Sequence, residues 1–405
     1  MAKEALAEFI PQTPDQITAE WLTSTLGDGT ARVTGFTTGT PGSGVGFSGI
    51  TTKLTIDWDA KESTLPSEVL AKFPTDMAHR GLTEQEGGYE REIWFYEGLG
   101  RDMPVRIPVC HHAEMDPGQP QEKRRKSAHR MNRTPAPIAR FAAKRITKLV
   151  RATKRRYVVL IEYIADARVT PLDKTVPRAD LEAMMRVLAK IHARYWRDHR
   201  LPSDPATSYD TASQNFKFLQ AGYDLWVDDF FDRTPGLEDQ HRVVMDWAQA
   251  NLDQVLVRLN EPYTLLHGDA RSDNMLFLDD GGLVVIDFGT ISSGPPGWDV
   301  AYAMSAAVEP GVDARTTLDA LADVYHHALV AEGVTDYSRE TLGNDIDVVL
   351  CFLGHRQVLT AMVMEGGYDT DGAGETANLG DLWMRKIIDL LPKEIPILET
   401  DHGPC

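Results

Sequence analysis

Short runs of β-branched and aromatic residues dominate the first 160 residues. Two such runs between residues 31 and 58 are separated by a cluster of Gly, Ser and Pro, which predicts a β-hairpin with a glycine-rich tip. Residues 68–73 and 157–164 predict two further strands. A short helix is expected to begin after Thr18, and helical spacing predicts another helix over residues 89–99.

Beyond residue 164 the spacing of apolar positions becomes helical. Helices are predicted over residues 179–196, 212–232, 238–258, 313–332 and 343–364. Among them, residues 263–290 contain two apolar β-type runs joined by DDGG, which predicts a hairpin with polar residues at both ends. The pattern therefore predicts an α+β protein, with a small β-rich lobe over residues 1–163, a connector near 162–170, and a larger helical lobe over residues 164–405.

Composition restricts the class of protein. The chain has 405 residues, of which 42% are hydrophobic and 25% are charged, close to the average for globular proteins. No apolar run approaches the roughly 20 residues needed to cross a bilayer, and the N-terminal residues lack the apolar core of a signal peptide. The three cysteines fit no disulfide framework or zinc spacing. We therefore expect a cytoplasmic protein with reduced thiols.

The net charge of -18 is distributed unevenly, because residues 121–156 carry 14 Lys and Arg against one acid. Within this segment an apolar helical face is predicted among the Lys and Arg residues, formed by Ile138, Phe141, Ile146, Leu149 and Val150. This pattern is typical of a basic amphipathic helix at an anionic membrane surface. The alternative is a solvated insertion. The acidity of the whole chain argues against a nucleic-acid partner, while the acidic C-terminal part suits a cationic ligand.

The strongest chemical pattern is HGDARSDN followed by IDFG. It places Asp269 five residues before Asn274 and eighteen before Asp287. Phosphoryl transfer needs a carboxylate to orient the attacking hydroxyl, and oxygen ligands to hold Mg²⁺ on the phosphates. Asp269 suits the first role, and the other two suit the second. A hairpin would fold Asp287 back beside the loop that carries Asp269.

These residues resemble the catalytic loop and metal-binding motif of the aminoglycoside phosphotransferase and choline kinase branch of the protein-kinase-like superfamily. That branch writes its loop HGDxxxxN, as His267 to Asn274 do here, and its second motif IDW or IDF. The resemblance implies a two-lobed kinase-like fold and an enzyme dependent on ATP and Mg²⁺. It makes Asp269 the catalytic base, and it makes Asn274 and Asp287 the magnesium ligands.

The resemblance also implies nucleotide-binding residues in the N-terminal lobe. Gly44 and Gly46, at the tip of the first hairpin, would let backbone N–H groups approach the phosphates. Lys72 in VLAKF resembles the lysine that pairs with the phosphates. Glu92 on the following helix is its expected partner, with Glu90 as the competitor.

Other positions follow from the same resemblance. Glu162 and Tyr163, where the chain leaves the small lobe, are expected to contact adenine through their main chain. Arg271 lies where related enzymes place a cation against the transferred phosphoryl group, although a solvent-facing arginine is the alternative. Asp299 resembles an aspartate that supports the catalytic loop by accepting backbone hydrogen bonds. His192, like His111 and His112, is expected to be an ordinary core or surface histidine without metal-ligand partners.

The expected acceptor is a small molecule, because only 12 residues separate Asp287 from Asp299. That is too short for the activation segment of a protein kinase. An aminoglycoside hydroxyl is one candidate acceptor. A host metabolite or a lipid-like alcohol, as in ecdysteroid-kinase-like relatives, is another. A non-catalytic nucleotide-binding protein that docks through its basic segment is a further alternative, and the oligomeric state stays open.

Overall fold

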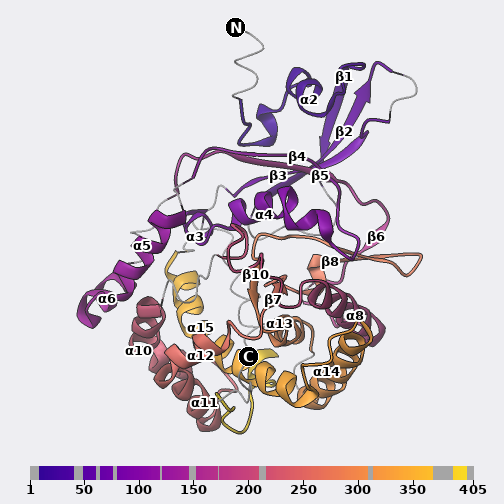
Figure 1. The fold of residues 1–405 in the computed structure, drawn as a ribbon. Helices are drawn as coiled ribbons and strands as arrows, with labels where there is room; N and C mark the ends of the chain where they lie inside the picture. Colours follow the sequence, from indigo (N-terminus) through magenta and orange to yellow (C-terminus); the bar gives the residue numbers. More distant parts are fainter. Residues whose placement is uncertain are drawn as a thin grey trace. The chain divides into compact units, whose positions relative to one another are not determined.

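β-branched and aromatic residues form a five-stranded antiparallel sheet in the computed structural model (Figure 1). The strand order is β1-β2-β3-β5-β4. The strands are β1 Val33–Gly39, β2 Gly49–Trp58, β3 Glu68–Pro74, β4 Cys110–Met115 and β5 Tyr157–Glu162. The predicted hairpin and the two predicted strands are therefore confirmed, whereas β4 was not foreseen.

The structure describes residues 9–40, 49–60, 64–75, 80–118, 121–145, 152–171, 173–208, 216–308, 313–367 and 386–398. The chain divides into two compact units. The sheet unit comprises Met1–Gln119, Arg151–Val169 and Leu276–Gly289, and the helical unit comprises Pro120–Val150, Thr170–Met275 and Thr290–Cys405.

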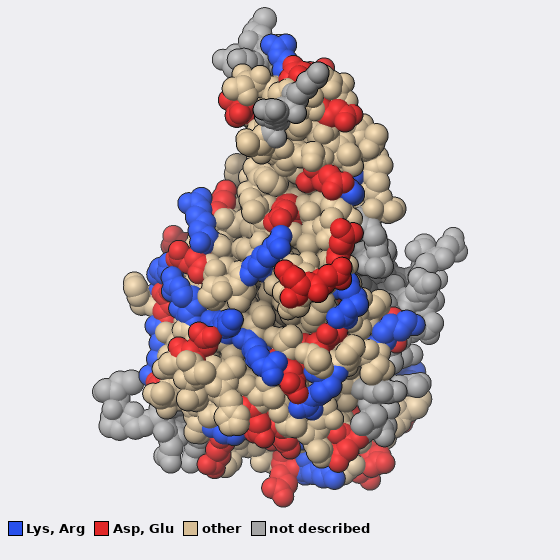
Figure 2. Space-filling model, turned by 90° about the vertical axis from the view of Figure 1, so that its right-hand side faces the viewer, with Lys and Arg blue, Asp and Glu red and all other residues tan. Residues whose placement is uncertain are grey.

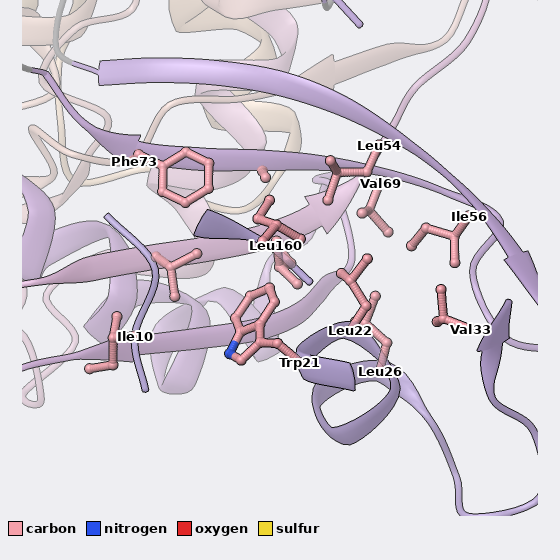
Figure 3. Close-up of a cluster of buried hydrophobic side chains, with 13 residues drawn as sticks. Ile10, Trp21, Leu22, Leu26, Val33, Leu54, Ile56, Val69, Phe73 and Leu160 are labelled. Atoms are coloured by element: carbon pink, nitrogen blue, oxygen red, sulfur yellow. The ribbon is translucent and has the colours of Figure 1, made fainter. Parts of the chain in front are cut away.

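The N-terminal helix α2 (Ala19–Leu26) covers one face of the sheet. The hydroxyl oxygen of Thr18 accepts a hydrogen bond from the Trp21 backbone N–H at 3.1 Å, so the predicted start of the helix is confirmed. Trp21 and Leu22 are buried against strand residues such as Leu160 (Figure 3). The cluster gives the sheet unit a hydrophobic core of its own, made up of Ile10, Ile17, Trp21, Leu22, Leu26, Val33, Leu54, Ile56, Val69, Ala71, Phe73, Val158 and Leu160.

Two helices and a second small sheet complete the sheet unit. The helices are α3 (Arg80–Glu86) and α4 (Gly88–Glu97), and the small sheet has the order β6-β8-β9. Its strands are β6 Ala167–Arg168, β8 Met275–Leu278 and β9 Leu283–Val285. The DDGG sequence turns the chain between β8 and β9, where Leu278 N donates to Gly282 O at 2.9 Å. The predicted hairpin is thus confirmed in its second half.

The helical unit contains most of the predicted helices. They are α8 Arg178–Arg194, α10 Phe216–Arg233, α11 Asp239–Ala250, α12 Leu252–Arg258, α14 Ala314–Ala331 and α15 Arg339–Gly367. The helix predicted over 238–258 is divided in two at Asn251, and α13 (Gly297–Ala307) was not foreseen. The strands β7 (Thr264–Leu266) and β10 (Ser292–Gly294) pair antiparallel in this unit.

The described part of the basic segment forms α5 (Gln121–Asn132) and α6 (Ala136–Ala143). Of the predicted apolar face, Ile146, Leu149 and Val150 lie outside the described residues. Both helices lie beside α10 and belong to the helical unit (Figure 1). The compact units therefore interleave along the chain and do not follow a single boundary. The predicted division into lobes at residue 163 stays a prediction.

The observed α+β arrangement, an antiparallel sheet followed by helices, confirms the predicted fold class. Among the described residues, no helix is both long enough and apolar enough to span a bilayer. Figure 2 shows one face of the molecule, on which acidic and basic side chains are interspersed.

The core of the sheet unit predicts a large effect for one substitution. Leu22→Ala removes a fully buried side chain from α2 and should lower the free energy of unfolding by about 2–5 kcal/mol, because a cavity is left behind. Val257→Ala, at a site that is 71% exposed on α12, should change it by less than about 0.5 kcal/mol. Urea unfolding followed by circular dichroism measures both values. Equal effects would contradict the assigned core.

Candidate active site

A lysine whose side chain is only 15% exposed connects three segments of the sheet unit. Lys72 on β3 places its Nζ 2.5 Å from Glu92 Oε1 on α4 and 3.5 Å from Asp287 Oδ1, just after β9. Burial alone would lower the pKa of Lys72, but the charges of Asp287 and Glu92 and their hydrogen bonds raise it. Burial raises the pKa of Glu92, and Lys72 opposes that effect. The lysine is therefore held as an ammonium group between two carboxylates.

The residue after Asp287 fixes the segment onto α4. The Phe288 ring stacks on Phe95 with the ring centroids 3.9 Å apart, and both side chains are buried. Asp287 itself has a φ of 64°, in the left-handed region that residues other than glycine rarely adopt. An unfavourable backbone conformation held in place by buried packing is common at functional sites.

Glu90, the competing partner for Lys72, faces a different neighbour. It is fully buried and forms an ion pair with Arg155, just before β5. Residues two apart on a helix do not share a face, so α4 can direct Glu92 to Lys72 and Glu90 to Arg155. The structure thus brings the expected partner to Lys72.

Four further residues of the sheet unit were expected to bind the nucleotide: Gly44, Gly46, Glu162 and Tyr163. Gly44 and Gly46 lie outside the described residues. The Glu162 backbone N–H donates to Val109 O at 2.8 Å, and its carboxylate accepts from Arg106 Nη2 at 3.0 Å. The ring of Tyr163 lies under Lys53, whose Nζ is 4.1 Å from the ring centroid. Both connector side chains therefore have local partners, and the main-chain N–H of Glu162 is already used.

In the helical unit, Asp269 and Asn274 form one hydrogen-bonded loop. The amide Nδ2 of Asn274 donates to the main-chain oxygen of Asp269 at 2.9 Å and to its Oδ2 at 3.1 Å. The guanidinium Nε of Arg271 lies 2.9 Å from Asp269 Oδ1 and 3.5 Å from Asp273 Oδ1. Arg271 therefore lies against the carboxylate of the predicted base, and the alternative of a solvent-facing arginine is wrong, since its side chain is only 16% exposed.

A buried carboxylate, that of Asp299, accepts hydrogen bonds from the backbone of this loop. Asp299 on α13 accepts hydrogen bonds from the backbone N–H groups of His267 at 2.7 Å and Gly268 at 2.9 Å. The predicted supporting role of Asp299 is thus confirmed. Gly268 has a φ of 80°, and a Cβ at this position would lie 2.2 Å from the carbonyl oxygen of Thr290. Only glycine fits there.

Sequence reasoning missed two contributors to the loop. His192 on α8 was expected to be ordinary, but its Nε2 lies 3.1 Å from Asp299 Oδ2 and its Nδ1 lies 2.7 Å from the Tyr325 hydroxyl, all fully buried. Tyr302 on α13 hydrogen-bonds to Asp269, and its pKa is raised by burial and by the charge of that carboxylate. Tyr302 follows Asp299 by three residues on α13, which is the spacing of neighbours on one helix face. Because α13 itself was not foreseen, the sequence offered no signal for this contact.

The donor chemistry of Asn274 and Asp287 fits Mg²⁺. Because Asn274 uses its amide nitrogen to hold Asp269, its amide oxygen is the atom left to act as a ligand. Asp287 supplies a carboxylate in the sheet unit, and oxygen ligands are those that Mg²⁺ prefers. No group of three His, Cys, Asp or Glu side chains in the described parts of the chain could hold a metal by itself. A magnesium site that includes substrate phosphates needs no such group.

Comparison with known proteins gives a family and a fold. Residues 86–336 match the model of the phosphotransferase enzyme family, APH. No curated protein matches the chain significantly. Amicoumacin kinase hAmiN, solved in complex with AMP-PNP, Ca²⁺ and Ami, has a TM-score of 0.52 and 14% sequence identity, with 98% of this chain and 99% of that chain covered. This likeness confirms the predicted kinase-like fold.

Two further solved structures are less similar. The gentamicin-APH(2")-IIa complex has a TM-score of 0.49 and 14% identity, with 95% of this chain and 100% of that chain covered. Choline kinase LicA from Streptococcus pneumoniae has a TM-score of 0.46 and 13% identity, with 93% of this chain and 98% of that chain covered.

The environment of Gly268 predicts the result of a matched pair of substitutions. Gly281 has a similar φ of 83°, but no atom lies within 4 Å of the point where a Cβ would stand, so Gly281→Ala should cost only the backbone term of about 1–2 kcal/mol. Gly268→Ala should cost clearly more, since its methyl group collides with Thr290 O. Urea unfolding compares the two variants. Equal losses would contradict the close approach at Gly268.

Proposed function

We propose that this chain, which belongs to the phosphotransferase enzyme family, transfers the γ-phosphate of ATP to a hydroxyl group of a small molecule with the help of Mg²⁺. The observation that carries the proposal is the buried ammonium of Lys72 between Glu92 and Asp287. A buried cation of this kind is suited to phosphate oxygens, and its carboxylate partners keep it charged and oriented.

In this proposal the sheet unit binds the nucleotide. Lys72 contacts the phosphates, and the backbone at Gly44 and Gly46 covers them. The main chain at Glu162 and Tyr163 contacts adenine. The backbone N–H of Glu162 already donates to Val109 O, so it could donate to adenine only if that hydrogen bond broke. The main chain of Tyr163 is therefore the stronger candidate for adenine recognition.

The helical unit supplies the base. Asp269 accepts the proton of the acceptor hydroxyl while the hydroxyl oxygen bonds to the γ-phosphorus and the bond from phosphorus to the ADP oxygen breaks. Asn274 fixes one carboxylate oxygen of Asp269, and Arg271 lies against the other. Bound Mg²⁺, with Asn274 and Asp287 as its protein ligands, would neutralise charge on the phosphates.

Arg271 has two roles that its position supports. Its guanidinium touches Asp269 in this structure, so it orients the base before substrates bind. A cation at this point also suits the transferred phosphoryl group, whose charge grows on its equatorial oxygens in the transition state. We assign both roles to Arg271. When the phosphoryl group is transferred, the guanidinium exchanges part of its contact with Asp269 for a contact with phosphate oxygens.

The proposed acceptor is a small molecule with a hydroxyl group, and several chemical classes fit this description. Trp298 donates from Nε1 to Gly268 O at 3.4 Å, and its ring centroid lies 5.9 Å from the Arg356 guanidinium carbon. Two aromatic residues, Trp298 and Tyr302, therefore contact the loop that carries Asp269. Such rings suit a sugar, an aminoglycoside ring or a lipid-like alcohol. Measuring ADP release against aminoglycosides, macrolides, sugars, amino alcohols and sterols identifies the class.

Replacement of the base should remove turnover. Asp269→Asn should lower kcat by about 100-fold to 10,000-fold, because the amide cannot accept the hydroxyl proton, while binding of Mg²⁺-ATP is retained. The matched control is Asp253→Asn, on the exposed surface of α12, which should leave kcat unchanged. ADP release with an accepted substrate measures kcat, and calorimetry measures ATP binding. Unchanged turnover in Asp269→Asn refutes the assigned role.

Replacement of the lysine should act on the nucleotide. Lys72→Met should lower kcat/KM for ATP by about 10-fold to 150-fold, the range for loss of one charge-assisted hydrogen bond. Lys154→Met, at an exposed position of the same unit, serves as the control. Steady-state kinetics with ATP varied compares the two variants. A loss for Lys72→Met no larger than that for Lys154→Met would exclude Lys72 from phosphate binding.

A further inference from the structure

The helix α6 exposes its large apolar side chains and buries its small ones. Ile138 and Phe141 are 57% and 58% exposed, whereas Ala139 and Ala143 are 5% and 1% exposed. A helix on the surface of a globular protein normally directs its largest apolar residues toward the core. The reversed arrangement leaves two bulky apolar side chains on the outer surface of a highly charged segment.

The buried face of α6 explains why the helix is held in this orientation. Ala139 and Ala143 pack with Ala221 of α10 in one small hydrophobic cluster, against which Phe218, Leu225 and Trp226 are also packed. Arg140 adds an ion pair with Asp224 of α10, with the Nη2 and Oδ2 atoms 2.7 Å apart. The segment is therefore a fixed part of the helical unit, and its outer face is presented by the fold.

The segment that carries the exposed apolar pair is rich in cations. Residues 121–145 contain nine Lys and Arg and one acid, a net charge of +8 in a chain whose total is -18. This segment is therefore positively charged, whereas the rest of the chain is strongly negative. The cations are Lys123, Arg124, Arg125, Lys126, Arg130, Arg133, Arg140, Lys144 and Arg145.

One cation contacts the exposed apolar pair directly. Ile138 and Phe141 are three residues apart on one face of α6, and Arg145 lies in the turn that follows the helix. The Arg145 guanidinium carbon lies 4.0 Å from the centroid of the Phe141 ring. An apolar side chain under a cation that can extend beyond it is the arrangement expected at a lipid-water interface, where the ring enters the acyl boundary and the cation contacts headgroups.

We propose that α5 and α6 form a docking surface for an anionic lipid membrane. The cations attract the negative leaflet, and Ile138 and Phe141 insert at the boundary between headgroups and acyl chains. Exposed bulky apolar residues favour lipid over nucleic acid, because phosphate contacts with a nucleic acid require only the cations. The proposal is independent of phosphotransfer, since none of these residues belongs to the candidate active site.

The test is sedimentation of the full chain with vesicles. Vesicles of phosphatidylcholine and phosphatidylserine in equal parts should bind the protein, and vesicles of phosphatidylcholine alone should bind it much more weakly. Lys123→Gln, Arg125→Gln and Lys126→Gln combined should weaken binding by about fivefold for each cation removed. Ile138→Ser with Phe141→Ser should weaken it by about tenfold or more. All five side chains lie on the surface, and circular dichroism verifies that the variants are folded.

Matched controls carry the same changes elsewhere on the helical unit. Val243→Ser with Val257→Ser alters two other exposed apolar residues, and Lys174→Gln, Lys190→Gln and Arg233→Gln combined removes three other surface cations. Both controls should bind vesicles like the parent chain. Equal binding to both kinds of vesicle, or no effect of the Ile138 and Phe141 changes, overturns the proposal. Salt-sensitive RNA binding that depends on the cations but not on the apolar pair would likewise overturn it in favour of nucleic acid.

Discussion

The buried charge of Lys72 is the constraint on which the sheet unit depends. An ammonium group removed from water is costly unless carboxylates and hydrogen bonds compensate it. Glu92 and Asp287 provide that compensation from a helix and from a segment more than 200 positions later in the chain. Satisfying one charge therefore fixes β3, α4 and the end of β9 relative to one another, and it keeps the lysine ready for an anionic ligand.

The helical unit uses the same principle with the opposite sign. The buried carboxylate of Asp299 has the backbone N–H groups of His267 and Gly268 and the ring of His192 as its partners. These contacts hold the backbone of the loop that carries Asp269. In each unit a residue with a proposed chemical role is thus positioned by a buried ionisable side chain, whose own cost of burial is offset by several partners.

Much of the fold could be predicted because a helix or strand that buries one face carries its apolar residues at regular intervals along the sequence. The helices α8 and α14 and the first hairpin have such a pattern. By contrast, α13 is buried almost all round and β4 is half-buried on both faces, so neither shows the expected alternation. The motif residues of the candidate site were found because HGDARSDN and IDFG resemble a known family pattern, and that resemblance also indicated Lys72 and Glu92. His192 escaped because a single histidine in an amphipathic helix shows no such pattern, and the choice between Glu90 and Glu92 depended on how α4 is rotated.

The connectivity of the two units has a consequence for how the protein is made. The five strands of the main sheet are all present once residue 162 has been synthesised, but the hairpin of β8 and β9 belongs to the same unit and emerges only after residue 275. Asp287 thus reaches Lys72 late, after more than half of the helical unit has left the ribosome. Until then Lys72 has only one of its two carboxylate partners, so this group of buried charges is completed late in biosynthesis. Neither unit could be transplanted as one uninterrupted gene segment.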